Sequence, residues 1–568
     1  MQSKIVSNVL RARYYGRTVT TTRYYSAQAA PVNEGKDPEW DSALPYEKIP
    51  RMTLRQALKN FAPGGRYHNA SAPEIHRLCQ QDFGDLVRFP GILGRKDTVM
   101  TFLPDDFEKV FRTEGPWPNR RGLATFVHYR KEVRPDVFKG LGGLVSEQGE
   151  NWQKFRSIVN PVLLQPKVVR SYVGKLDEVT SEFMNIMLKI RDKRNELPAD
   201  FGQWLNRWSL ESTGVLSVDS RLGVLDEQES EEARRIVQLT KELFELVYQL
   251  DILPSIWRYY KTPKYHRLMK VFDELTTIAM SKVDEAVLRL EKSPSTTSDA
   301  QSVLEKLLKI DRNVAIVMSF DMILAGVDTV SVTLFQANHR PNDKIKLQTT
   351  SAITGILYYL ATNPEKQTKL REELRSILPQ KDSPLTPDNM QNLPYLRACI
   401  KEGMRLFPPI PLTPDNMQNL PYLRACIKEG MRLFPPIIGN LRVTGKDIVL
   451  QGYRIPKGTD IGMGSMVVQQ SDRFVPRAKE FLPERWLKPP EPGCPHAKDA
   501  HPFVYLPFGN GPRTCVGRRL AMLEMEILIA RITRLFEYRW NYGDLKIQTT
   551  LVNTPVNDLK FQMVEVDD

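Results

Sequence analysis

The sequence lacks the features that mark several classes of protein. It has only 5 cysteines in 568 residues, and they are too scattered for the disulfide framework of a small secreted domain. It has no apolar run of about 18 residues, the length that a transmembrane helix needs. It also lacks the alternation of strands and helices that builds a doubly wound sheet. What is present, 41% hydrophobic and 26% charged residues, is the composition of a large globular protein.

The N-terminal region lacks acidic residues. Residues 1–33 contain no Asp or Glu, and their basic residues are Lys4, Arg11, Arg13, Arg17 and Arg23. A basic, acid-free N-terminus predicts a mitochondrial presequence, with a disordered basic tail as the alternative. The stretch RYYS at Arg23–Ser26 resembles an arginine-directed cleavage site, so we expect residues 1–25 to be removed and residues 26–568 to remain.

The net charge of the chain is +13, and it falls to +8 without the presequence. That surplus is too small to indicate nucleic-acid binding. It suits an acidic protein partner or an anionic membrane surface.

Two irregularities interrupt the chain. The segment PLTPDNMQNLPYLRACIKEGMRLFPPI occurs at 384–410 and again at 411–437, and two identical copies are too few for a solenoid. Residues 330–348 divide an apolar helical pattern and contain Pro341, which a helix interior disfavours. The ends of this insert, Val-Ser and Gln, can be encoded as intron boundaries. We interpret the insert as an unspliced intron, and we expect the helix to stop after Thr329 and to resume near Thr349.

The rest of the sequence predicts a mainly α fold with a smaller β region. Helical periodicity occurs at 170–192, 229–250, 267–291 and 517–537. Short strand patterns lie at 440–455 and near the C-terminus. Irregular Pro- and Gly-rich sequence covers 474–514, and linkers are expected near 292–300 and 378–388.

The segment FGNGPRTCVGRRLA, Phe508–Ala521, carries the strongest chemical signal. Its glycines predict an irregular loop, and Cys515 directly precedes a helix, whose N–H groups and positive dipole end stabilise a thiolate. A thiolate held in this way is the iron ligand of oxygen-activating haem enzymes, and Arg513 could pair with an anionic cofactor group. One alternative is an ordinary buried cysteine. Another is zinc, bound by Cys494, His496, His501 and Cys515, but only one side of that set has paired spacing.

The cysteine segment resembles that of the cytochrome P450 family, and other motifs of the family precede it in order. These are Trp152-x-x-x-Arg156, AGVDT at Ala325–Thr329, Glu402-x-x-Arg405 with its copy Glu429-x-x-Arg432, and Arg485 in FLPERWL. The resemblance covers roughly residues 45–568. It implies the P450 fold and haem b (iron protoporphyrin IX), with Cys515 as the iron ligand.

The resemblance also assigns roles to the other motif residues. Trp152, Arg156, Phe508, Arg513 and Gly517 would bind the cofactor, the first two through a propionate. Asp328 and Thr329 would relay protons to iron-bound oxygen, although such residues also occur in ordinary helices, where Thr bonds its own backbone. Glu429, Arg432 and Arg485 would also belong to the cofactor-binding set, as members of a buried ion network. We expect the second Glu-x-x-Arg copy to occupy the native site, because LFPPIIGNLRV follows Arg432 directly.

Within the family, the chain resembles the insect mitochondrial group associated with xenobiotic oxidation. The resemblance implies a haem-thiolate monooxygenase that oxidises hydrophobic small molecules with O2. Electrons would come from NADPH through ferredoxin reductase and a [2Fe–2S] ferredoxin. The enzyme would rest peripherally on the matrix side of the inner mitochondrial membrane. Ecdysteroid hydroxylation is an alternative activity, and a catalytically impaired haem-binding relic is an alternative class, because the insert falls inside the oxygen-activating helix.

Two further sets of residues follow from this resemblance. Basic residues that would face the ferredoxin are Arg424 and Lys428 (or Arg397 and Lys401 in the first copy), Arg518 and Arg519. Candidate walls of the substrate pocket are the distal helix, the segment Ile437–Leu441 and the turn Asn553–Val556.

Overall fold

A computed structural model gives the structure of most of the chain. The described residues are 37–68, 70–226, 231–292, 301–330, 333–334, 348–349, 352–375, 380, 420–487, 491–549, 553–555 and 557–566. For 325–330, 333–334, 348–349, 352, 547–549 and 554 the description is of the backbone alone. The predicted presequence 1–25 and the first tandem copy, 384–410, lie outside the described residues.

Helices make up most of the described structure. The α-helices are α1 (Leu54–Phe61), α2 (Ala72–Phe83), α3 (Pro104–Thr113), α4 (Ala124–His128), α5 (Pro135–Phe138), α6 (Gly143–Ser146), α7 (Gly149–Leu163), α8 (Pro166–Ser171), α9 (Val173–Ile190), α10 (Phe201–Val218), α11 (Glu231–Val247), α12 (Pro263–Lys292), α13 (Val303–Leu308), α14 (Arg312–Val330), α15 (Ala352–Ala361), α16 (Pro364–Arg375), α19 (Pro421–Leu433), α20 (Ser465–Gln469) and α21 (Arg518–Leu535). Short 3-10 turns are η1 (Tyr46–Lys48) and η5 (Pro483–Trp486), and π-helical turns are η2 (Tyr129–Val133) and η3 (Tyr248–Ile252).

The strands are short. They are β1 (Leu86–Phe89), β2 (Thr98–Thr101), β3 (Thr333–Leu334), β4 (Gln348–Thr349), β5 (Asn440–Val443), β6 (Ile448–Leu450), β7 (Tyr453–Ile455), β8 (Asp460–Met463), β9 (Phe536–Arg539), β10 (Ile547–Thr549), β11 (Asn553–Pro555) and β12 (Gln562–Glu565). The mainly α prediction with a smaller β region is therefore confirmed.

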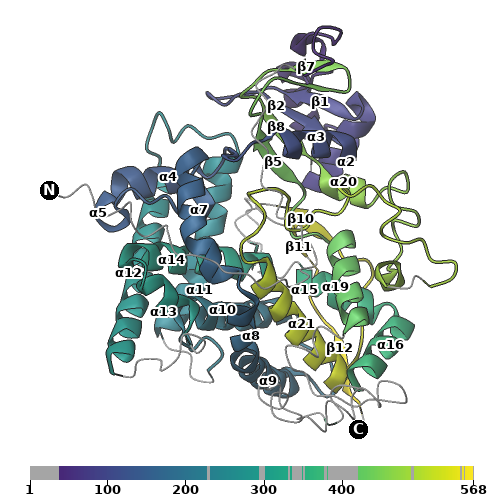
Figure 1. Cartoon of the computed structure of the whole chain (residues 1–568). Helices are drawn as coiled ribbons and strands as arrows, with labels where there is room; N and C mark the ends of the chain where they lie inside the picture. The colour runs from purple at the N-terminus through teal and green to yellow at the C-terminus, as the bar shows by residue number, and fades with distance from the viewer. Residues whose placement is uncertain are drawn as a thin grey trace, which may run out of the picture.

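The largest sheet has the strand order β1-β2-β8-β5 and lies at the top of Figure 1, beside α2, α3 and α20. The pair β2–β8 is parallel, with Val99 opposite Ile461, whereas β1–β2 and β5–β8 are antiparallel. A hydrophobic cluster separate from the main helical core packs between this sheet and α3. The sheet brings β5, which follows α19, close to the segment after α3, since Val443 N donates to Asn119 O at 2.9 Å.

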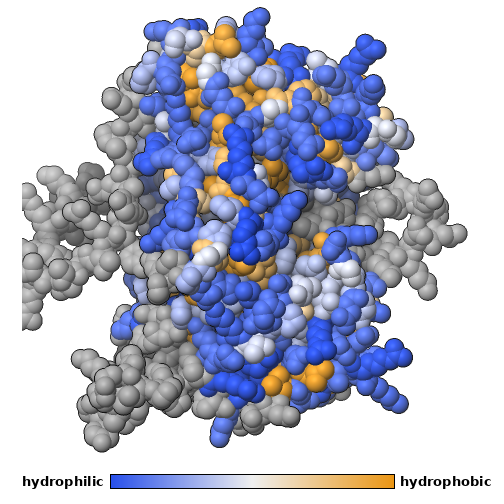
Figure 2. Space-filling view, turned by 90° about the vertical axis from the view of Figure 1, so that its right-hand side faces the viewer, coloured by the Kyte–Doolittle hydropathy of each residue, from blue (hydrophilic) through white to orange (hydrophobic). Residues whose placement is uncertain are grey.

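The helices surround two long members that carry sequence motifs. Helix α14 packs against α10, α12 and α13, and α21 packs against α9, α16 and α19. None of the helices in the described ranges has the length and hydropathy that crossing a bilayer requires. The face seen in Figure 2 is largely hydrophilic, and its hydrophobic residues form interrupted patches.

One helix prediction is wrong in detail. The periodicity over 170–192 predicted a single helix, but α8 ends at Ser171 and α9 begins at Val173. Tyr172 at this break is 1% exposed, and its hydroxyl accepts a hydrogen bond from Val303 N at 2.8 Å. The break therefore serves a tertiary contact with α13, which no periodicity along 170–192 could reveal.

The backbone around the insert agrees with the interruption expected from sequence. Helix α14 ends at Val330, one residue after Thr329, and α15 begins at Ala352 instead of near Thr349. At the two ends of the insert, β3 and β4 pair in antiparallel fashion, with Thr333 opposite Thr349.

Candidate cofactor site

The Cys515 loop has the irregular backbone that its glycines predicted. Gly509 and Gly511 have φ angles of +70° and +74°, a left-handed conformation that favours glycine. Cys515 N donates to Phe508 O at 3.0 Å, which closes the loop before α21 begins at Arg518. The Cys515 residue is exposed, yet the surrounding protein raises the pKa of its thiol by desolvation, and the backbone N–H of Gly517 opposes that rise.

Three residues predicted to bind the cofactor meet beside this loop. Trp152 of α7 is 1% exposed, and the Arg513 guanidinium lies 4.1 Å from the centroid of its ring. Arg156, one turn later on α7, donates from Nη2 to Thr514 O at 2.9 Å. Arg513 donates from Nη2 to Glu147 O at 2.7 Å. The Trp-x-x-x-Arg pair is therefore part of the interior of the cofactor site and not a surface feature.

Three further charged residues complete the site and were missed from the sequence. Arg442 of β5 forms a buried ion pair with Glu114 at 2.5 Å, and both side chains are 2% exposed. Arg120 lies near both Arg442 and Cys515, as its electrostatic interactions show. Arg442 lies in the stretch NLRV, where a charged residue among apolar ones was an available signal. Arg120 belongs to no recognisable pattern.

Burial and mutual repulsion shift the pKa values of the charged side chains in this cluster. Desolvation, reinforced by the charges of Arg120 and Arg442, lowers the pKa of Arg513 to about 9. Desolvation also lowers the pKa of Arg120 to about 10. Burial raises the pKa of Glu114 to about 7, although Arg442 and Arg513 act in the opposite direction. The arginines therefore outnumber the carboxylates around the Cys515 loop.

The residues present fit a haem. Two buried donor atoms, Arg513 Nη1 and Arg156 Nε, have no hydrogen-bond partner within the described part of the chain. A buried donor without a partner costs free energy, and so does an excess of buried positive charge. An anionic ligand relieves both costs. A haem presents two propionates for such donors and an iron for a thiolate ligand such as Cys515.

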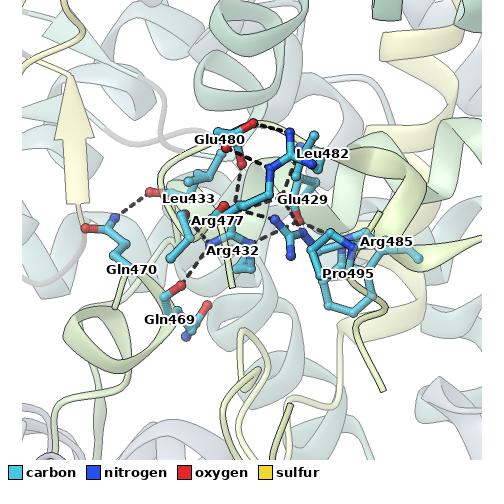
Figure 3. A network of polar contacts seen from close by, with 12 residues as sticks. Glu429, Arg432, Leu433, Gln469, Gln470, Arg477, Glu480, Leu482, Arg485 and Pro495 are labelled. Atoms are coloured by element: carbon cyan, nitrogen blue, oxygen red, sulfur yellow. Dashed lines mark hydrogen bonds and ion pairs between the residues drawn. The ribbon is translucent and has the colours of Figure 1, made fainter. Parts of the chain in front are cut away.

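A second arginine cluster is closed by the protein itself (Figure 3). Glu429 of α19 accepts from Arg432 at 2.8 Å and from Arg485 at 2.9 Å. Its other oxygen accepts from Trp486 Nε1 at 2.8 Å. The other N–H groups of these two guanidiniums donate to main-chain oxygens. Those of Arg432 donate to the carbonyl oxygens of Gln469, Ala478 and Glu480. The second Glu-x-x-Arg copy thus forms the network with Arg485, whereas Glu402 and Arg405 lie outside the described residues.

The other predicted residues are placed as follows. Asp328 and Thr329 lie in the last turn of α14, and only their backbone is described. Phe508 is half-buried, with Arg518 5.6 Å from its ring centroid. Asn553 donates from its side chain to Pro435 O at 2.7 Å, so the turn at 553 lies beside the segment after α19. The turn that begins at Asn553 and the segment that begins at Ile437 are two of the candidate pocket walls, and they are therefore neighbours.

The zinc alternative finds no support. Within the residues that the structure describes, no three His, Cys, Asp or Glu side chains are arranged to hold a metal ion. His501 faces Glu108 of α3 at 3.2 Å, and His496 faces Leu487 O at 3.3 Å. The histidines thus have separate structural contacts.

The sequence profile of the Cytochrome P450 family matches residues 64–337, 348–415 and 412–558. The chain belongs to the cytochrome P450 family. Its breaks from the profile fall at the two irregularities of the sequence, since 338–347 are unmatched and the overlap at 412–415 joins the two tandem copies.

Curated relatives agree over nearly the whole chain. The chain is 41% identical to cytochrome P450 CYP12A2 of Musca domestica over 543 residues, which cover 93% of each protein. It is 40% identical to probable cytochrome P450 12a5, mitochondrial, of Drosophila melanogaster, again with 93% of each covered. It is 38% identical to cytochrome P450 12b1, mitochondrial, of Drosophila acanthoptera, with 93% of this chain and 91% of the relative covered.

This P450 is a haem-dependent monooxygenase. When bound, the haem supplies the chemistry that activates O2, and the protein supplies orientation, charge and exclusion of water. Here the Cys515 loop offers the thiol, and the donors of Arg156 and Arg513 are available to propionates. The Glu429 network holds α19 against the chain that runs from Gln469 to Arg485. It thereby supports the polypeptide that leads into the Cys515 loop.

Proposed function

We propose that this P450 oxidises hydrophobic xenobiotics in the mitochondrial matrix. Its electrons come from NADPH through ferredoxin reductase and an acidic [2Fe–2S] ferredoxin. The resemblance to the insect mitochondrial group supports the substrate class, and the names of two relatives carry the word mitochondrial. Asp328 and Thr329 relay protons at the end of α14.

The observation that carries the ferredoxin proposal is a basic groove next to the Cys515 loop. Its basic residues are Arg170, Arg424, Arg518 and Arg519, and its apolar floor includes Val169, Val173, Met522 and Leu523. The groove has a volume of about 300 Å³. Arg518 and Arg519 are exposed and begin the helix that follows the thiolate ligand. A negatively charged protein docked in this groove would bring its cluster close to Cys515, and charge attraction would steer its approach.

Exposed apolar residues support a peripheral contact with the inner membrane. They lie on α1, in the turn between β1 and β2, and at the end of η3 and directly after it, namely Leu54, Leu58, Phe61, Ile92, Leu93, Ile252, Leu253, Ile256, Tyr259 and Tyr260. The second and third segments are adjacent, because Arg95 donates to Ile252 O at 2.6 Å and to Leu253 O at 2.8 Å. Apolar side chains gathered in this way suit insertion into a lipid interface.

Reconstitution tests the proposed function directly. The haem-loaded protein is combined with ferredoxin, its reductase and NADPH, and turnover is measured on a panel of pesticide-like compounds and ecdysteroids. Preferential oxidation of the pesticide-like compounds supports the proposal, and preferential oxidation of the ecdysteroids would replace it with hormone synthesis. The ferrous carbon-monoxide spectrum reports the thiolate ligand. Cys515→Ser should abolish the red-shifted Soret band, and the matched variant Cys494→Ser should retain it.

One observation favours a second candidate, a haem-binding relic. Helix α14 ends at Val330, so Asp328 and Thr329 lie at a helix terminus and not in mid-helix. A displacement of reacting groups by about 1 Å can lower a rate on the order of a hundredfold. Deleting residues 330–348 should therefore increase turnover and reduce peroxide release, with haem binding at least as good. Equal turnover and coupling in both chains would show that the relay tolerates the insert.

A further inference from the structure

A buried ion pair connects α14 with the π-helical turn η2. Arg130 of η2 donates from Nη2 to Asp321 Oδ1 of α14 at 2.5 Å. The side chains are 1% and 3% exposed, and the guanidinium lies 5.2 Å from the ring centroid of Phe138 and 5.3 Å from that of Phe320. The pair is thus enclosed by apolar rings. Asp321 also lies seven residues before Asp328 on the same helix, about 10 Å along its axis.

Both members of the pair also bind the segment Gly142–Gln148, which contains α6. Asp321 Oδ2 accepts from Leu144 N at 2.8 Å, and Arg130 Nη1 donates to Gly142 O at 2.6 Å. The two side chains together therefore satisfy one donor and one acceptor of the segment's backbone. The first end of the segment is fixed to α14 by these bonds.

The other end of the same segment contacts the cofactor site. Arg513 Nη2 donates to Glu147 O at 2.7 Å and to Gln148 Oε1 at 3.1 Å. The side chain of Gln148 also accepts from the backbone N of Arg120 at 2.8 Å. Within seven residues the segment therefore runs from the helix of the proton-relay motif to the arginines beside Cys515.

We propose that Asp321 is a positioning residue of this P450. Together with Arg130 it fixes the segment Gly142–Gln148, and through that segment it sets the position of Arg513 and the shape of the adjacent ligand space. Buried ion pairs contribute little net stability compared with apolar side chains of similar size, but they can fix a single geometry. The backbone bonds made by this pair show which geometry it fixes.

Gly143 provides a steric argument for the same proposal. Its φ is +72°, and a Cβ at this position would collide with Arg130 Nη1 and Asp321 Oδ2 and, less closely, with Val317 Cγ1 of α14. Gly140 has a similar φ of +80° but nothing within 4 Å of a Cβ. Alanine at either glycine therefore suffers the same kind of backbone strain, and only alanine at 143 also displaces the ion pair. The two substitutions form a matched test and control.

The experiment compares the haem-loaded protein with two pairs of variants. The first is the double variant Asp321→Leu with Arg130→Met, which removes the ion pair without leaving an unpaired buried charge. Its control is Asp177→Leu with Arg531→Met, which removes another buried pair, at 2.6 Å between α9 and α21. The second comparison is Gly143→Ala against Gly140→Ala, which keeps the test possible if the double variant does not fold.

Amide exchange of the peptide that covers residues 142–148 is the primary measurement. It should become at least tenfold faster in the Asp321/Arg130 and Gly143 variants and stay unchanged in both controls. The affinity ratio for 4-phenylimidazole and imidazole, read from the Soret shift, should change at least threefold in the same two variants. The affinity ratio rests on the proposed function, because it requires a bound haem. The amide exchange does not rest on it.

Two results would overturn the proposal. One is unchanged exchange of 142–148 in folded Asp321/Arg130 and Gly143 variants. The other is faster exchange of that peptide in the controls to the same extent, which would indicate a general loss of stability. The red-shifted carbon-monoxide band is measured on every sample. Its absence in the wild-type protein would contradict the role of Cys515 in the proposed function. It would not bear on the role of Asp321.

Discussion

The two buried arginine clusters of this P450 differ in how their charges are compensated. Around Glu429, the donors of Arg432 and Arg485 find the carboxylate or main-chain oxygens. Around Arg513, arginines outnumber carboxylates, and two buried donors have no partner among the described residues. Both clusters contain residues of family motifs, but the first is complete within the protein and the second has room for an anionic ligand. The two unpartnered arginine donors beside Cys515 therefore leave a place for an anionic ligand, whereas the donors of Arg432 and Arg485 are satisfied within the protein.

Removal of the carboxylate from the complete cluster should have the largest effect. Glu429→Gln leaves two buried guanidinium groups without an anion, which is expected to cost about 3–5 kcal/mol of unfolding free energy. Urea unfolding and the yield of haem-loaded protein measure this loss. The tandem duplication offers a matched control, because Glu402→Gln makes the same change in the same local sequence. If Glu402→Gln were the more damaging variant, the first copy would occupy the native site.

A substitution in the incomplete cluster should lower haem affinity more than it lowers the stability of the haem-free protein. Arg513→Gln removes a charged donor that the proposed site assigns to a haem propionate, a bond worth about 1.5–3 kcal/mol, which corresponds to roughly a tenfold to hundredfold loss of haem affinity. The haem-free protein should lose less stability than it does in Arg432→Gln, because the bonds of Arg513 to Glu147 O and Gln148 Oε1 are lost but so is one repelling charge. Haem transfer to apomyoglobin and thermal unfolding measure the two effects. A fall in haem-free stability as large as that of Arg432→Gln would contradict the distinction between the clusters.

The incomplete cluster should also make stability depend on pH through Glu114. Its pKa of about 7 in the folded protein is above its ordinary value of 4.5, so the folded state binds the proton more tightly than the unfolded state. The stabilisation is therefore full below about pH 4.5 and is lost as the pH rises through about 7, by up to about 3 kcal/mol. Urea unfolding of the haem-free protein near pH 5 and near pH 7.5 measures it. Glu114→Gln should reduce the difference, and an equal difference in this variant would exclude Glu114 as its source.

The sequence predicted the motifs but not the tertiary contacts of their residues. Cys515, Trp152 and Glu429 were recognisable because spacing along the chain is what defines their motifs. Arg442 and Glu114 are 328 positions apart, and their pairing depends on how β5 is placed beside the end of α3. The break at Tyr172 has the same origin, since its partner Val303 belongs to another helix. The ion pair of Asp321 and Arg130 likewise joins two segments that are 191 positions apart.

Arg424 belongs to neither cluster. Its charge is only partly compensated by the protein, so substitutions here should give the smallest effect. It forms a bidentate pair with Glu526, with Nε at 2.8 Å and Nη2 at 3.2 Å, at the edge of the basic groove. Arg424 is 27% exposed in its side chain and Glu526 only 7%, so an approaching ferredoxin carboxylate competes with Glu526 for the same guanidinium.

Glu526→Gln weakens this competitor and should strengthen ferredoxin binding by about twofold to fivefold at low salt, in line with pairs worth about 1 kcal/mol or less. Arg424→Gln should weaken binding by a similar factor, and both effects should disappear at high ionic strength, where exposed charges are screened. The apparent KM for ferredoxin in reconstituted turnover measures these changes. If Glu526→Gln weakened binding as much as Arg424→Gln does, the role of Glu526 would be to orient Arg424 and not to compete for it.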